Sequence, residues 1–242
     1  MDFSILLLAG FIVFLSQFVK GFSGFGSGLF AMPFLVLLFD IKFALAFTIL
    51  LDLVSGSVML YREKREVSTS VLSILVVGIL GGAILGGLIL PKIDFRILKK
   101  LFGVTVVLMA AHMFLQRDSR RKMRNKRFWG FLAGFTAGLT GVLFGVNGPP
   151  VVYYANQSCD SKRQLRATLY FVFLADSVFR TLTYAVTGVL GLQSVSFALL
   201  MVPFLFLGII AGNRVHFNVS EKSFKRVITL IVLIVGLIAI LR

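Results

Sequence analysis

The chain has few charged residues and only one cysteine. Asp, Glu, Lys and Arg together make up 14% of its 242 residues, whereas 58% are hydrophobic. A single cysteine, Cys159, excludes an intramolecular disulfide and a conventional paired-cysteine metal or redox site. The two histidines, His112 and His216, are far apart and lack a second ligand at metal spacing, so we expect no metal site. The sequence has no P-loop, dinucleotide fingerprint or nucleophile with a matching base, which argues against ATP-driven transport, cofactors and enzyme chemistry.

The apolar residues form runs long enough to cross a membrane. The mean hydropathy is +0.96, far above that of an ordinary soluble domain. A membrane-spanning helix takes roughly 17 to 25 mainly apolar residues, and short charged connectors separate runs of about this length. We therefore predict an all-α, multi-pass integral membrane protein. The apolar runs are residues 3–19, 28–39, 43–61, 70–90, 95–115, 128–143, 150–156, 167–187, 195–211 and 227–241.

Basic residues greatly outnumber acidic ones, with 25 Lys and Arg against 10 Asp and Glu. Because they are concentrated in connectors beside apolar runs, we interpret them as determinants of topology that contact lipid headgroups, and we expect no nucleic-acid partner. The most basic connector, residues 116–127, holds seven Lys and Arg and one Asp. The positive-inside tendency predicts that this connector is cytoplasmic.

Two glycine-rich stretches suggest that one half of the chain repeats the other. GFSGFGSGLFAMP (21–33) can be laid over GLTGVLFGVNGPP (138–150) at a shift of 117 positions. Gly82 and Gly86 pair with Gly208 and Gly212 at a shift of 126, and Asp52 pairs with Asp176 at a shift of 124. We predict a first membrane repeat over residues 1–115, a basic cytoplasmic linker over 116–127 and a second repeat over 128–242.

The number of membrane crossings in each repeat predicts that the two repeats have opposite orientations. Each contains three full spans and a pair of segments around its glycine break, which is either a re-entrant hairpin or two short helices, giving eight to ten membrane segments. An odd number of crossings turns the second repeat over. With residues 116–127 inside, residues 62–66, 160–166 and 214–226 also fall inside. Residues 92–100 are basic but fall outside, so this segment does not follow the positive-inside tendency.

The two breaks are predicted to surround a small anion. A half-helix that begins at a break presents unpaired N–H groups and partial positive charge, and glycine lets a substrate approach the backbone. Close helix packing is the competing reading, which we prefer for Gly78, Gly82 and Gly86. The predicted substrate-binding residues are Gly21, Gly24, Ser27, Gly28, Pro33, Gly141, Gly145, Asn147, Gly148, Pro149, Pro150 and Arg180.

Two carboxylates lie within apolar runs, where charge is costly. Asp176 has Arg180 one helical turn later, so the two can neutralise each other, and the planar fork of Arg180 also suits an oxyanion. Asp52 has no basic residue one turn away, so it is protonated, paired with another helix, or coupled to a proton or cation. We name Asp52 and Asp176 as candidate coupling residues. For Lys20 and Arg166 we favour snorkelling to headgroups.

These motifs resemble those of the TauE/SafE sulfite exporter family of membrane permeases. The resemblance rests on the two glycine stretches, on Ser55-Gly56 followed by Tyr61-Arg62, and on LKKLFG at 98–103, and it covers nearly the whole chain. The resemblance implies a transporter of small sulfur-containing or organic anions that lies in the cell (cytoplasmic) membrane and is not an ATPase. The family's glycine triplet before the proline is interrupted here by Ser27 and by Val146-Asn147, so these residues mark where the anion preference can differ.

We therefore expect a secondary transporter of a small anion such as sulfite or a sulfonate, working by alternating access between two inverted halves. An anion channel and a membrane scaffold without flux of its own are the alternatives. A coupling proton or cation and a homo-oligomer are options that the sequence leaves open.

Overall fold

The computed structural model describes residues 3–62, 67–115 and 126–215, in which all regular secondary structure is α-helical. The described helices are α1 (Phe3–Ser23), α2 (Ser27–Leu38), α3 (Ile41–Arg62), α4 (Thr69–Ile89), α5 (Phe95–Leu115), α6 (Lys126–Phe144), α7 (Gly148–Ser158), α8 (Lys162–Val186) and α9 (Leu192–Val215). The predicted run 227–241, and most of the basic segments 62–66, 116–127 and 214–226, lie outside the described residues.

Six of these helices are long and apolar enough to cross a membrane: α1, α3, α4, α6, α8 and α9. This confirms the predicted all-helical membrane class. The helices α2 and α7 have 12 and 11 residues. At about 1.5 Å per residue each is shorter than a hydrocarbon core of roughly 30 Å. They are therefore half-helices rather than full crossings.

The predicted segments agree with the helices, with the largest differences where polar residues begin or end a helix. The prediction for α5 matches its observed bounds. Helix α8 begins at Lys162, five residues before the predicted start at Ala167. Ser161 explains the early start, because its hydroxyl accepts a hydrogen bond from the backbone N–H of Gln164 at 3.0 Å. The first turn of α8 is rich in basic residues, so its hydropathy is low. A prediction based on the length of apolar runs therefore missed the start of the helix.

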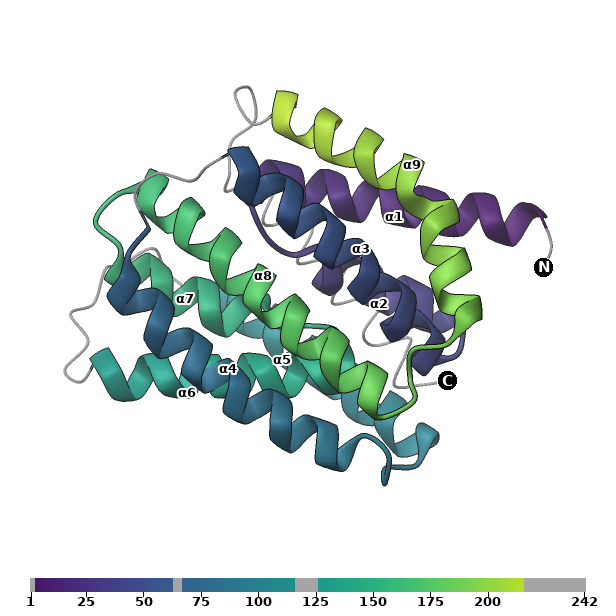
Figure 1. Cartoon of the computed structure of the whole chain (residues 1–242), viewed down its shortest axis with the longest axis horizontal. Coiled ribbons are helices and arrows are strands. Elements are labelled where there is room, and N and C mark those ends of the chain that lie inside the picture. The colour runs from purple at the N-terminus through teal and green to yellow at the C-terminus, as the bar shows by residue number, and fades with distance from the viewer. Residues whose placement is uncertain (1–2, 63–66, 116–125, 216–242) are drawn as a thin grey trace.

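Two helix pairs join one half of the chain to the other. Helix α1 packs along α9, and α4 packs along α6; Figure 1 shows these pairs on opposite sides of α3 and α8. A β-carbon at Gly82 would lie 2.0 Å from the carbonyl oxygen of Phe135, and one at Gly208 would lie 2.4 Å from that of Phe14. These glycines therefore permit the two backbones of each pair to touch.

The glycine contacts support the predicted pairing at a shift of 126. Gly82 and Gly208 meet residues Phe135 and Phe14, which themselves lie 121 positions apart. The first residues of α2 and α7 are separated by the same 121 positions. The two inter-half helix pairs thus use corresponding residues.

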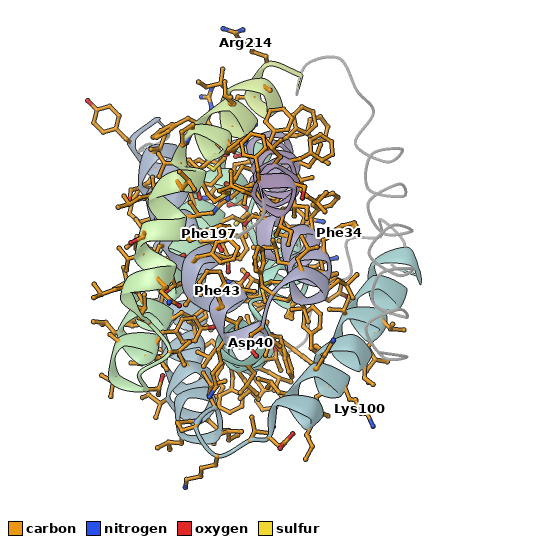
Figure 2. All side chains as sticks on the ribbon, turned by 90° about the vertical axis from the view of Figure 1, so that its right-hand side faces the viewer. Phe34, Asp40, Phe43, Lys100, Phe197 and Arg214 are labelled. Atoms are coloured by element: carbon orange, nitrogen blue, oxygen red, sulfur yellow. The ribbon has the colours of Figure 1, made fainter. Side chains whose placement is uncertain are left out.

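An aromatic cluster fixes α3 against α9. The ring centroids of Phe43 and Phe197 are 5.4 Å apart, and those of Phe47 and Phe197 are 4.9 Å apart. Figure 2 shows Phe43 and Phe197 lying side by side between the two helices. The same view places Arg214 and Lys100 at opposite ends of the bundle.

Candidate functional site

Each half contains one short interruption between a long helix and a half-helix. Helix α1 ends at Ser23 and α2 begins at Ser27, whereas α6 ends at Phe144 and α7 begins at Gly148. Within the interruptions, φ is +86° at Gly24, +90° at Gly26 and +71° at Gly145, a left-handed conformation that favours glycine. We call residues 24–26 the first break and residues 145–147 the second break.

The breaks correspond at a shift of 121, so the predicted shift of 117 is wrong by one helical turn. Gly21 and Gly138, which the sequence placed in the breaks, lie inside α1 and α6. A β-carbon at Gly21 would lie 2.8 Å from the carbonyl oxygen of Ile209, and one at Gly138 would lie 2.2 Å from that of Ile79. Both glycines therefore serve the packing between helices.

The prolines that the sequence paired also occupy different places. Pro33 lies buried inside α2, six residues after that half-helix begins. Pro149 and Pro150 lie in the first turn of α7, where a missing backbone N–H costs little. Only the second break is therefore followed directly by proline.

The two breaks meet in the folded chain. A β-carbon at Gly28, in the first turn of α2, would lie 2.0 Å from the carbonyl oxygen of Gly145. A β-carbon at Gly148, the first residue of α7, would lie 3.3 Å from the ring of Phe25 in the first break. The starts of both half-helices thus lie at one place between the two halves.

The first half holds a buried ion pair beside this place. Lys20 Nζ of α1 lies 2.9 Å from Asp52 Oδ1 of α3 and donates to Ser55 Oγ at 2.7 Å. Ser27, the first residue of α2, donates to the same Asp52 oxygen at 2.7 Å. Lys20 is 4% exposed, so the predicted snorkelling to headgroups is wrong. Its partner lies 32 residues away on another helix, one of the options predicted for Asp52.

The second half holds a corresponding carboxylate. Asp176 Oδ2 of α8 accepts a hydrogen bond from Asn147 Nδ2 and another from Arg180 Nη1 at 3.3 Å. Asn147 is the last residue before α7, so in both halves the carboxylate accepts a bond from a residue at the start of a half-helix. The predicted ion pair between Asp176 and Arg180 is confirmed.

The second cluster contains polar atoms without partners. Arg180 is 1% exposed and Asp176 is fully buried. Among the described residues, Arg180 Nε and Nη2 and Asp176 Oδ1 have no hydrogen-bond partner. The Tyr184 hydroxyl lies beside the guanidinium but donates to the carbonyl oxygen of Val142 at 2.7 Å. Buried guanidinium donors are rarely left unpaired, so this group is a candidate ligand site.

The two clusters lie close enough to act on each other. Helices α3 and α8 pack together, and the charges of Asp52, Asp176 and Arg180 fall within electrostatic reach of one another. Together with Lys20, these three residues make two acidic and two basic side chains, so the combined cluster has no net charge.

Sequence reasoning missed three of the side chains around these clusters. Lys20 was assigned to the headgroups, and Ser55 and Tyr184 were not assigned to the site. Only the symmetric placement of Asp52 and Asp176 could have pointed to a partner for Asp52. Arg166 is half-buried and donates from Nη2 to the hydroxyl of Tyr170 at 3.0 Å, and its reach to the headgroups stays a prediction. Among the described residues, no group of three or more His, Cys, Asp or Glu could hold a metal ion.

Comparison with known proteins identifies relatives of the whole chain. The family model described as sulfite exporter TauE/SafE matches residues 8–238. A probable membrane transporter protein of Methanocaldococcus jannaschii is 24% identical over 260 aligned positions, which cover 98% of this chain and 95% of that protein.

A second relative matches over part of its length. A probable sulfite/organosulfonate exporter of Cupriavidus necator is 30% identical over 97 residues, covering 40% of this chain and 38% of the relative. No solved structure matches the chain.

Proposed function

Since the chain belongs to the TauE/SafE sulfite exporter family, we propose that it is a secondary transporter that binds a small oxyanion between its two halves. Its membrane-transporter class follows from the family and the apolar helices. The proposal concerns the substrate, the site and the mechanism.

The observation that carries the proposal is the partly unpaired guanidinium of Arg180. It is buried, and two of its nitrogens have no hydrogen-bond partner among the described residues. Its planar fork of donors matches the oxygens of a sulfite or sulfonate group. An anion bound there would accept charge-assisted hydrogen bonds from these unpaired nitrogens, each worth roughly 1.5 to 3 kcal/mol.

The half-helix starts support the same ligand. The backbone N–H groups at the start of a helix are unpaired and carry partial positive charge. The starts of α2 and α7 meet where Gly28 touches Gly145, beside the two carboxylate clusters. We therefore assign to the site Gly24, Ser27, Gly28, Gly141, Gly145, Asn147, Gly148, Pro149, Pro150 and Arg180. Gly21 and Pro33 remain predictions from the sequence, and their positions inside helices give them a packing role.

Alternating access between two inverted halves is the proposed mechanism. The halves are residues 1–115 and 128–242, joined by the basic connector 116–127. Three features support this arrangement: the corresponding breaks, the corresponding carboxylates, and the helix pairs α1–α9 and α4–α6 that join the two halves. Two inverted repeats place equivalent contacts on both sides of one central site. Rocking of the halves would then open the site to one side of the membrane at a time.

The substrate class follows the relatives. The Cupriavidus necator protein is named a probable sulfite/organosulfonate exporter, and we propose the same anion class for this chain. The test is a thermal-shift panel on purified protein with sulfite, methanesulfonate, acetate and chloride. A ligand that binds the folded state raises apparent stability with its concentration. Stabilisation by sulfite or methanesulfonate above that by chloride is expected, and no response to any oxyanion would refute the proposed ligand.

A further inference from the structure

Each carboxylate takes two hydrogen bonds on one oxygen, one of them from a basic side chain, but the two carboxylates differ in burial. Asp52 accepts bonds from Lys20 and Ser27 on Oδ1, and its side chain is 12% exposed. Asp176 receives both of its bonds on Oδ2, and Oδ1 has no partner among the described residues although the residue is fully buried. Among the described residues, only Asp176 therefore has a carboxylate oxygen that is both buried and without a partner.

The unpartnered oxygen faces a glycine. A β-carbon at Gly141 of α6 would lie 3.3 Å from Asp176 Oδ1 and 3.2 Å from Arg180 Cδ. Because residue 141 has no side chain, none from this position crowds Oδ1. A carboxylate oxygen in this position can take up a proton without breaking an existing bond.

Charge balance requires a partner for any anion bound here. Lys20, Asp52, Asp176 and Arg180 sum to zero, so a monovalent anion would leave one uncompensated negative charge. Burying such a charge costs several kcal/mol even after the protein relaxes. A proton on Asp176 would restore neutrality and free the guanidinium to bind the anion.

Few other ionisable groups face Asp176. Arg180 and Tyr184 share its helix, Asp52 lies on α3, and the described residues of α4 include no ionisable side chain. Those on α6 and α7 are Lys126, Arg127, Tyr153 and Tyr154. Lys126 and Arg127 precede Gly141 by 14 residues or more, about 20 Å along the helix. The phenol of Tyr154 lies at Gly130, three turns from Gly141.

We propose that Asp176 takes up one proton each time a monovalent anion binds, so that the transporter moves the anion together with a proton. The proton comes from water on the side to which the site is open, adds to Oδ1, and leaves with the anion on the other side. Asp52, held by Lys20, stays ionised throughout. This inference rests on the proposed function, because it assumes that the anion binds at Arg180.

The test counts protons during binding. Methanesulfonate is the probe because it stays monovalent across the working pH range. Calorimetric titration of the wild type in buffers of different ionisation enthalpy should give one proton taken up per anion bound. Where Asp176 is ionised in the free protein, apparent affinity should then fall about tenfold for each unit of rise in pH.

Variants locate the proton. Asp176→Asn should bind methanesulfonate with no proton uptake and with no dependence on pH, whereas Asp40→Asn, which changes an exposed carboxylate, should keep one proton per anion. Binding without proton uptake by the wild type overturns this proposal while leaving the anion site intact, as does a requirement for sodium in place of the proton. Absence of any sulfite or sulfonate binding by the wild type refutes the proposed function instead. If Asp176→Asn does not fold, the wild-type proton count alone decides.

Discussion

Gly28 lies directly against the carbonyl oxygen of Gly145, so that a β-carbon on residue 28 would be 2.0 Å from that oxygen. This contact brings the start of the half-helix in one half of the chain to the break in the other. Both residues were expected at a ligand site from the sequence, but the direct contact between them was not predicted.

Gly28→Ala should separate the two breaks and destabilise the protein. The atom that a methyl group meets is backbone, so the chain itself must move, and we expect a loss of at least about 3 kcal/mol, the upper range for overpacking. The measurement is unfolding of purified protein in detergent. Gly191→Ala is the control, because a β-carbon there meets nothing within 4 Å. Equal stability of the two variants would contradict the contact.

Lys20→Met should destabilise the protein by about 3 to 5 kcal/mol, because it leaves Asp52 buried without its counter-charge. The double variant Lys20→Met/Asp52→Asn should recover most of this loss, since a neutral amide oxygen can still accept the bond from Ser27. Lys126→Met, which changes an exposed lysine, should have little effect. A double-mutant cycle in detergent measures the coupling. Additive losses would show that Lys20 and Asp52 do not interact.

Adjacent glycines of α4 give a matched test of the packing between α4 and α6. A β-carbon at Gly82 would lie 2.0 Å from the carbonyl oxygen of Phe135, whereas one at Gly81 would meet only the Phe135 ring at 3.5 Å. Gly82→Ala should cost at least about 3 kcal/mol, as for Gly28→Ala, because the added methyl group meets backbone. Gly81→Ala should be neutral or stabilising by up to about 1 kcal/mol, because alanine favours the helix. The midpoints of thermal unfolding compare the two, and the reverse order would contradict this helix pairing.

Arg180→Lys should weaken methanesulfonate binding roughly tenfold to hundredfold, since the ammonium keeps the charge but loses the planar fork. Arg163→Lys, an exposed arginine of the same helix, is the matched control and should bind as the wild type does. Calorimetric titration measures both. An unchanged affinity in Arg180→Lys would place the anion elsewhere.

The helices could be predicted from the sequence because apolar length and the membrane thickness constrain them strongly. The Asp176–Arg180 pair was also accessible, since residues four apart lie on one face of a helix. The shift between the breaks was misread because glycines recur at four-residue intervals: moving the alignment by one turn pairs Gly24 with Gly141 instead of Gly145. Lys20 was misassigned because its partner Asp52 is distant in sequence, and apolar length does not reveal which helices pack together.

The asymmetry between the two carboxylates was likewise beyond the sequence. Asp52 and Asp176 occupy matched positions in the repeat, which predicts similar roles. They differ in burial, because the side chain of Asp52 is 12% exposed whereas that of Asp176 is 1% exposed and leaves Oδ1 without a partner among the described residues.

The most direct test of the central claim is counterflow of labelled anion in liposomes containing the purified protein. Liposomes loaded with unlabelled sulfite or methanesulfonate should accumulate external label transiently, with a rate that saturates as external anion rises. This result is expected of a carrier that alternates between two sides. Flux that rises linearly and shows no transient accumulation would identify a channel, and the absence of flux for every anion of the panel would contradict the account.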